Sequence, residues 1–209
     1  YLNYEFCNIS EFGNNINNKK KHIAITFDDG FSSWTKILKL FENEEITATF
    51  YLNSIFFEEK PCLEKFYKNI NSNGYEKLIN LTELNQIISM GHEIGSHTHS
   101  HHTLSSLSEE DFEYEVSKNI EFLDQLNIEL NSFAIPFGMR RYLKKSQFNH
   151  LNKIFDTVCF GEPGMLFNQN HNMIQRYPWV SSRSFTFNIQ NICTDSSKFN
   201  NLTKRSGLG

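Results

Sequence analysis

Short apolar runs alternate with amphipathic stretches along most of this chain. The apolar runs are rich in β-branched and aromatic residues, which is typical of buried strands. The amphipathic stretches repeat their apolar residues every three or four positions, which is typical of helices. We expect strands at residues 22–27, 47–52, 92–96, 133–136, 157–160 and 174–180, and helices at 34–43, 82–91, 108–126 and 143–155. Strands that alternate with helices predict βα units around a mainly parallel sheet.

A few segments stand outside this alternation. Residues 53–80 are expected to form an irregular insertion, whose aromatic side chains (Phe56 among them) belong to the core or, alternatively, stack on sugars. The Asn-rich stretch at 14–18 and the tail at 196–209 are typical of a loop and a terminus. The chain length indicates one domain spanning 1–209.

Polar or glycine-containing turns directly follow three of the expected strands. Asp28 and Asp29 close the first strand, histidines from His97 onward follow the third, and residues 137–138 follow the fourth. The carboxyl ends of parallel strands meet at one edge of the sheet, where α/β folds build their active sites. We therefore expect a single active site at this edge.

Five of the eight histidines fall between residues 92 and 102. Clustered neutral imidazoles are most often metal ligands, so we expect a metal site here. The spacing leaves the ligands open, because His97, His99 and His101 share one face of a strand, whereas only His97 and His101 share one face of a helical turn. A polar surface loop is the alternative.

The adjacent carboxylates Asp28 and Asp29 are the second candidate feature. If both were buried without a cation, they would repel one another. A metal ion held by one carboxylate removes this conflict and leaves the other free as a base. The alternative is a simple Asp-Gly turn at a strand end, which is common by itself.

Composition limits the partners and the compartment. A net charge of −4 and a pI of about 6.1 give no general attraction to nucleic acid or anionic membranes. The four cysteines, at 7, 62, 159 and 193, have no close pairing, which argues against a zinc knuckle or a disulfide framework and favours the cytoplasm. No apolar run is long enough for a transmembrane segment. Removal of a leader before Tyr1 would instead allow a secreted or periplasmic location.

Three ordered motifs resemble the polysaccharide deacetylases (carbohydrate esterase family 4, the NodB homology domain). Residues 26–30, Thr-Phe-Asp-Asp-Gly, and 97–101, His-Thr-His-Ser-His, are similar to the family's first two motifs. Residues 132–138, Ser-Phe-Ala-Ile-Pro-Phe-Gly, resemble its third motif in a shorter form that lacks an arginine. The resemblance covers about 22–180 and implies an α/β domain with a distorted, incomplete (β/α)7-type barrel.

The resemblance also implies roles for individual residues. Asp28 corresponds to the general base that takes a proton from the attacking water. Asp29, His97 and His101 correspond to the ligands of one divalent metal ion, usually Zn²⁺ and sometimes Co²⁺ or Ni²⁺, so that His99 is not a ligand. The backbone N–H of Phe137 corresponds to the oxyanion donor.

The sequence departs from the family pattern in three ways. Ala134 stands where many members have an arginine that tunes the base. Arg176 is the candidate substitute, expected to reach Asp28, with an ordinary salt bridge at a strand end as the alternative. Pro136 and Trp179 are expected to contact substrate, although the family's Asp partner of such a tryptophan is absent. The general-acid histidine has no recognisable counterpart; the only later histidines are at 150 and 171.

The sequence therefore predicts a bacterial-type, metal-dependent hydrolase that removes acetyl groups from N-acetylated sugars of a polysaccharide or glycolipid. Its expected partner is an acetylated glycan or a lipid-linked sugar. Two alternatives stay open: a degenerate deacetylase-like domain that binds glycan without cleaving it, and an O-acetyl esterase or non-sugar amidase on the same scaffold.

Overall fold

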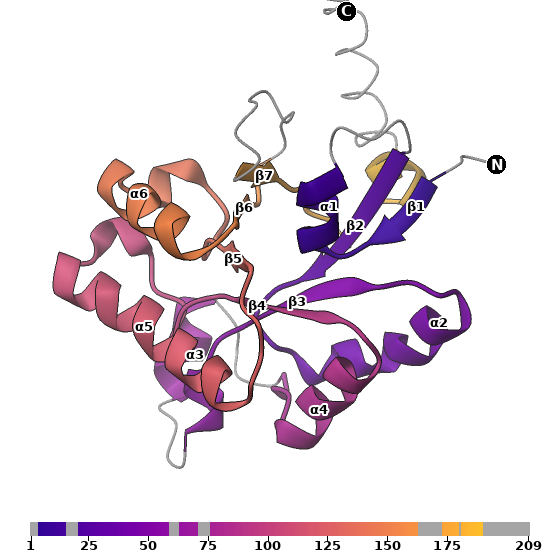
Figure 1. Ribbon diagram of the computed structural model, residues 1–209, viewed down its shortest axis with the longest axis horizontal. Coiled ribbons are helices and arrows are strands. Elements are labelled where there is room, and N and C mark those ends of the chain that lie inside the picture. Colours follow the sequence, from indigo (N-terminus) through magenta and orange to yellow (C-terminus); the bar gives the residue numbers. More distant parts are fainter. Residues whose placement is uncertain are drawn as a thin grey trace, which may run out of the picture.

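The structure, a computed structural model, describes residues 4–15, 21–58, 63–70, 76–162, 173–179 and 181–189 of the 209 (Figure 1). Seven strands form one parallel sheet in the order β1-β2-β3-β4-β5-β6-β7. They are β1 (Tyr4–Cys7), β2 (Lys21–Phe27), β3 (Ala48–Leu52), β4 (Glu93–Ser96), β5 (Ser132–Ala134), β6 (Thr157–Phe160) and β7 (Met173–Gln175). Since every strand runs parallel to its neighbours, their carboxyl ends lie at one edge of the sheet.

Helices pack against this sheet, most of them on its outside. They are α1 (Ile9–Asn15), α2 (Leu38–Asn43), α3 (Leu63–Asn69), α4 (Leu81–Ser89), α5 (Glu109–Gln125) and α6 (Lys145–Ile154), with short 3₁₀ turns at Ser32–Ile37, Ile55–Phe57, Leu104–Ser106 and Arg140–Tyr142. In Figure 1 the strands curl around an interior, with α2 and α4 on one side and α3, α5 and α6 on the other. The expected single domain with a distorted, incomplete (β/α)7 barrel is confirmed.

Most of the expected elements are present, with shifts at their ends. The last strand, β7, ends at Gln175 rather than at 180, and the helix expected at 34–43 begins as a 3₁₀ turn before α2. The insertion at 53–80 is not wholly irregular, because it contains a 3₁₀ turn and α3. Neither β1 nor α1 was expected. Gly13 and two asparagines weaken the helix signal of α1, because these residues have low helix propensity.

The long helices begin at residues suited to capping. The Asn80 side chain accepts hydrogen bonds from the backbone N–H groups of Thr82 and Glu83, and the Glu83 carboxylate accepts one from the N–H of Asn80. The Ser108 side chain accepts a hydrogen bond from the N–H of Asp111, and acidic residues fill the first turn of α5. These contacts satisfy N–H groups that a helix leaves unpaired at its start.

Apolar side chains form separate layers on the two sides of the sheet. Between the strands and the outer helices lie residues such as Phe41, Phe50 and Leu84. The barrel interior is filled by a second cluster from α1 and the strands, consisting of Ile9, Tyr51, Ala134, Cys159 and Ile174. The interior is therefore a packed core and leaves the carboxyl edge as the place for chemistry.

Helix α1 contacts both β2 and β6 and lies at the open side of the curled sheet (Figure 1). The Glu93 carboxylate of β4 accepts hydrogen bonds from the Ser10 N–H at 3.0 Å, the Ser10 hydroxyl at 2.9 Å and the Thr49 hydroxyl at 3.0 Å. The Ile9 N–H donates to the Thr49 hydroxyl at 2.9 Å, and the Ser132 hydroxyl also donates to Glu93. These bonds hold α1 against β3, β4 and β5.

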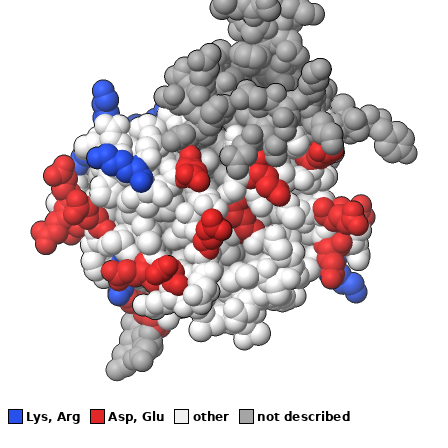
Figure 2. Space-filling model, in the orientation of Figure 1, with Lys and Arg blue, Asp and Glu red and all other residues white. Residues whose placement is uncertain are grey.

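Charged side chains and cysteines can be located among the described residues. On the face shown in Figure 2, acidic side chains are spread over the described surface, whereas basic side chains lie at the periphery. Among the described residues, no helix has both the length and the apolar character needed to span a bilayer. Cys7 and Cys159 are buried free thiols, and the other two cysteines lie outside the described residues.

Candidate active site

The predicted metal ligands converge at the carboxyl ends of β2 and β4. The Asp29 Oδ1 atom lies 3.3 Å from His97 Nε2 and 3.1 Å from His101 Nε2. One ligand atom from each of the three residues lies within 4.8 Å of the others. His99 points elsewhere, since its Nδ1 lies 2.9 Å from the Ser54 hydroxyl and its Nε2 lies 3.6 Å from Glu58. We call Asp29, His97 and His101 the Asp–His cluster.

The backbone around the cluster adopts unusual conformations. Of the six non-glycine residues with positive φ in the described ranges, four are found here: Asp29 (75°), Thr98 (67°), His101 (60°) and Phe137 (61°). Such conformations cost on the order of 1–3 kcal/mol each and persist only where the surroundings hold them. The strain is therefore concentrated at the site and requires a supporting network.

Buried polar side chains supply that network. The Asn119 amide donates to the carbonyls of Leu52 and Thr98, each at 2.9 Å, and accepts a hydrogen bond from the Ser96 hydroxyl. The Asn53 amide also donates to the carbonyl of Thr98, at 3.2 Å. Together these bonds fix the loop between the two ligand histidines.

Helix α5 holds the same loop at a second point. The Glu115 carboxylate accepts hydrogen bonds from both the N–H and the hydroxyl of Ser100. Within the loop, the Thr98 hydroxyl accepts a hydrogen bond from the His101 N–H at 3.1 Å. None of these supporting residues was singled out from the sequence. Of these residues, Asn53 could have been found from the sequence, because it is a polar residue that directly follows an apolar strand.

The Asp–His cluster has the donor set of a divalent metal site. His97 Nδ1 lies 2.8 Å from the Ala134 carbonyl, and because a carbonyl only accepts, Nδ1 carries the proton. In the neutral ring, Nε2 then presents a lone pair toward Asp29. The Asp29 Oδ1 atom is buried without a hydrogen-bond partner among the described residues. Lone pairs that converge in this way repel unless a cation lies between them, so the residues fit a metal ion.

The pKa shifts of Asp29 and His101 agree with this fit. Burial would raise the pKa of Asp29, but the neighbouring imidazoles of His101 and His97 outweigh it and hold that pKa below its usual range. Burial lowers the pKa of His101. A carboxylate and a neutral imidazole are the forms in which these side chains bind metals. Burial would lower the pKa of His97, but the Asp29 and Asp28 carboxylates outweigh it and raise that pKa.

Asp28 belongs to a separate pair. Arg176, immediately after β7, donates from Nη1 to Asp28 Oδ1 at 2.6 Å and from Nη2 to Asp28 Oδ2 at 2.7 Å. Arg176 Nη1 also donates to the Thr26 hydroxyl at 3.0 Å. The predicted contact between Arg176 and Asp28 is confirmed. Its two-point geometry fixes the plane of the carboxylate, which a single-point salt bridge would not do.

The Arg176 side chain is 12% exposed and the Asp28 side chain 30%, so the arginine is shielded from solvent while the carboxylate stays partly accessible. Burial alone would raise the pKa of Asp28, but the charge of Arg176, helped by His97, outweighs burial and holds that pKa below its usual range. Asp28 is therefore an oriented carboxylate that stays ionised at neutral pH.

The loop after β5 borders the cluster. Pro136 is buried, and the Phe137 ring lies 4.7 Å from the His101 ring, measured between centroids. Gly138 has φ +68°, and a Cβ there would lie 2.5 Å from the Gly161 backbone, so only glycine fits this turn. The N–H of Phe137 has no partner among the described residues.

The remaining sequence candidates are not brought to the cluster. Trp179 is 54% exposed and packs against Phe185 at 5.6 Å between ring centroids. His150 packs against Phe112 between α6 and α5, so it is not the missing general acid. His171 lies outside the described residues. Substrate contact by Trp179 stays a prediction.

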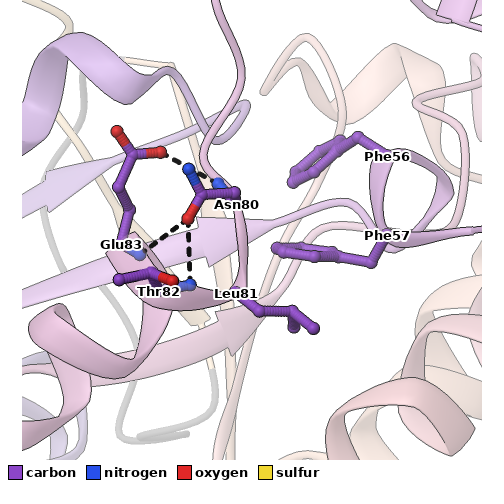
Figure 3. A pocket seen from close by; sticks show the side chains of 6 residues that line it. All are labelled: Phe56, Phe57, Asn80, Leu81, Thr82 and Glu83. Carbon is purple, nitrogen blue, oxygen red and sulfur yellow. Dashed lines mark hydrogen bonds between the residues drawn. The ribbon is translucent and has the colours of Figure 1, made fainter.

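A cavity of about 620 Å³ lies beside the start of α4 (Figure 3). It is lined by the rings of two phenylalanines and by the capping residues of that helix: Phe56, Phe57, Asn80, Leu81, Thr82 and Glu83. Its Asn and Glu side chains are engaged in the capping bonds drawn in Figure 3. Its lining includes no member of the Asp–His cluster, so we assign it no ligand.

Comparison with known proteins identifies the family. A family model described as polysaccharide deacetylase matches residues 15–151. Two peptidoglycan-N-acetylglucosamine deacetylases of Bacillus cereus are each 30% identical to this chain, one over 109 residues (51% of this chain, 32% of that protein) and one over 125 residues (59% and 49%). The matched part of the chain thus spans half or less of each relative.

A solved structure shows the same fold. The Streptococcus pyogenes deacetylase PplD in complex with acetate matches 92% of this chain and 79% of its own, with a TM-score of 0.72 and 18% sequence identity. The family model covers more than half of the chain, including the segments that carry Asp28, Asp29, His97 and His101. The chain therefore belongs to the polysaccharide deacetylase family.

Proposed function

We propose that this protein is a metal-dependent hydrolase that removes acetyl groups from N-acetylated sugars of a polysaccharide or glycolipid. The observation that carries the proposal is the position of the Asp28–Arg176 pair. Asp28 is the residue next to the cluster ligand Asp29, yet its carboxylate is held by Arg176 and not by the two histidines. A site that only bound a metal or a glycan would have no use for this second, separately oriented carboxylate.

The proposal assigns the cluster to one cation. Asp29, His97 and His101 would hold a divalent ion, and the nitrogen and oxygen donors favour Zn²⁺, with Co²⁺ or Ni²⁺ as alternatives. When bound, such an ion polarises a carbonyl and lowers the pKa of water. Three protein ligands leave room for water and substrate, as catalytic sites require.

The other residues supply proton transfer and charge stabilisation. Asp28 accepts the proton of the attacking water, and Arg176 keeps its carboxylate ionised and in a fixed plane. The Phe137 N–H, unpaired among the described residues, is the proposed donor to the developing oxyanion. Pro136 and Trp179 are the proposed substrate contacts. The donor of a proton to the leaving amine is not assigned.

Acetate release tests the proposal directly. The protein is stripped of metal, reloaded with Zn²⁺, Co²⁺ or Ni²⁺, and assayed on N-acetylated oligosaccharides and on a lipid-linked N-acetylated sugar. We expect acetate release that depends on reloading and reaches its maximum near one ion per chain. Release that is unaffected by complete removal of metal would contradict the proposed mechanism.

The two alternatives give different results in the same assay. An O-acetyl esterase would release acetate from an O-acetylated sugar and spare its N-acetylated counterpart, and a non-sugar amidase would spare both. A domain that only binds glycan would retain N-acetylated oligosaccharides in a binding assay without releasing acetate. The two-point orientation of Asp28 favours catalysis over binding alone.

A further inference from the structure

One large aromatic ring fills the barrel interior next to both parts of the site. Tyr51 of β3 is fully buried. The centre of its ring lies 5.2 Å from the guanidinium carbon of Arg176 and 6.4 Å from the centre of the His97 ring. The same side chain therefore neighbours the partner of the base and one member of the Asp–His cluster.

The hydroxyl end of Tyr51 is anchored on another strand. Its oxygen lies 3.2 Å from the sulfur of Cys159 on β6, which is also fully buried. Burial raises the pKa of Cys159 to about 11 and raises the pKa of Tyr51 well above its usual value. Both groups are therefore neutral at physiological pH. Their contact fixes the tilt of the ring without placing a charge beneath the site.

The neighbouring strand makes room for this ring. A Cβ at Gly95 of β4 would lie 2.3 Å from one Tyr51 ring carbon and 2.4 Å from another, closer than real atoms approach. Gly95 has no positive φ, so no turn requires a glycine there. The close approach of the Tyr51 ring explains the glycine.

The guanidinium of Arg176 needs support that its hydrogen bonds do not give. Its two terminal nitrogens are used on Asp28 and Thr26, but its Nε is buried without a partner among the described residues. The face of Tyr51 is therefore a main nonpolar contact of a buried cation. Cation–π attraction is strongest for such desolvated cations.

We infer that Tyr51 is a positioning residue for Arg176: its ring supports the guanidinium so that both terminal nitrogens stay directed at Asp28, and Cys159 and Gly95 hold the ring in place. The inference rests on the proposed hydrolase function, in which Asp28 is the base. Tyr51 touches no reacting atom in this scheme. It acts through Arg176 alone.

Kinetics on the metal-loaded protein test the inference. In Tyr51→Leu, kcat should fall about tenfold, the rate equivalent of losing one buried cation–π contact, with KM and metal content little changed. Tyr51→Phe keeps the ring and loses only the contact with Cys159, so it should keep most of the turnover, with a loss far smaller than that of Tyr51→Leu. If Tyr51→Phe lost as much turnover as Tyr51→Leu, the ring face would not be the support and the inference would be wrong.

A pair of cysteine variants covers the case in which Tyr51→Leu does not fold. Cys159→Ala removes the anchor of the ring, as Tyr51→Phe does, and should lower kcat to the same modest extent, whereas Cys7→Ala removes another buried thiol elsewhere and should not. Equal effects of the two substitutions on kcat would overturn the anchoring role of Cys159.

A double substitution separates positioning from general packing. If Tyr51 acts through Arg176, Tyr51→Leu should have little further effect on kcat once Arg176→Lys has removed the two-point contact. A residue that matters only for core packing would lower the melting temperature by the same amount in both backgrounds and its effects on kcat would add. Additive effects on kcat would therefore overturn the inference.

A nuclear magnetic resonance experiment gives a readout that does not depend on activity. The guanidinium signal of Arg176, assigned by its loss in Arg176→Lys, should report restricted rotation in the wild type and faster rotation in Tyr51→Leu or Cys159→Ala. Unchanged rotation would overturn the inference even in an active enzyme. The expected change in a protein that releases no acetate from any substrate would support the positioning role and contradict the proposed function instead.

Discussion

The two parts of the candidate site are assembled in different ways. The Asp–His cluster comes from two short segments, and its histidine loop is held by neighbouring buried polar groups such as Asn53, Asn119 and Glu115. The Asp28–Arg176 pair joins residues 148 positions apart and depends on a side chain after the last described strand. The first part requires only the pairing of β2, β3 and β4, whereas the second also requires β7 to be in place.

This difference predicts a separation of functions. Damage to the histidine loop should remove the metal, whereas damage to the Asp28 pair should leave the metal bound and stop the chemistry. The variants below test that separation, in order of decreasing expected effect.

The largest effect is expected at the cluster. His97→Ala and His101→Ala should each lose most of the bound metal, and turnover with it, because a site with three protein ligands then keeps only two. Metal content after dialysis, measured by elemental analysis, is the readout. His99→Gln is the matched control and should retain the metal, since His99 faces Ser54. Metal loss in the control equal to that in the ligand variants would contradict the assignment.

Asp28→Asn should stop turnover without releasing the metal. The amide has nearly the same shape but does not accept the proton of water at neutral pH, and general-base catalysis contributes about 10²–10⁴-fold. Steady-state kinetics and elemental analysis of the same sample give both readouts. Asp124→Asn, at an exposed position of α5, is the control and should behave as wild type. Retention of most activity in Asp28→Asn would place the base elsewhere.

Arg176→Lys should have a smaller effect on turnover and a distinct pH dependence. Lysine offers no planar pair of donors, so the hold on Asp28 weakens and its pKa rises toward the ordinary value. Since the base must be ionised, the acidic limb of the profile of kcat/KM against pH should move to higher pH. A limb that stays in place or moves to lower pH would mean that Arg176 does not tune the base.

The smallest effect on catalysis is expected in the supporting network, where stability should change instead. Asn119→Ala removes one of the two hydrogen bonds to each of the buried carbonyls of Leu52 and Thr98 and takes away the acceptor of the buried Ser96 hydroxyl, which costs about 1–3 kcal/mol of the free energy of unfolding. Urea unfolding measures this loss, with Asn149→Ala on the exposed face of α6 as control. Equal stability of the two variants would show that the loop does not depend on Asn119.

The residues of the Asp–His cluster could be singled out from the sequence because their residue types, at the ends of apolar strands, indicate their chemistry. Clustered imidazoles and paired carboxylates after apolar strands indicate a metal site by their residue types alone. The same pattern of residue types did not predict the buried polar side chains that support the histidine loop. Asn119 and Glu115 lie in the middle of a helix, where polar residues are usually solvated, and only the fold shows that they turn inward.

Other features depend on packing that no local pattern encodes. The reach of Arg176 to Asp28 was predicted from the missing arginine at position 134, but the part played by Tyr51 was not. A tyrosine in an apolar strand is typical of an ordinary core residue, and a glycine at position 95 indicates a weak point in the strand. Their fit becomes visible only when β3 and β4 are paired.

Because α1 packs into the barrel interior, the smallest part of the chain that can fold must include α1. A shortened chain that starts at β2 would keep every motif residue from Thr26 onward, but it would remove Ile9 from the interior and the Ser10 hydrogen bonds from Glu93. That carboxylate would then lose both Ser10 donors and face the space that Ile9 no longer fills, which favours the entry of water. For anyone trimming this protein for crystallisation or grafting its site, the boundary set by the barrel interior lies upstream of the boundary set by the motifs.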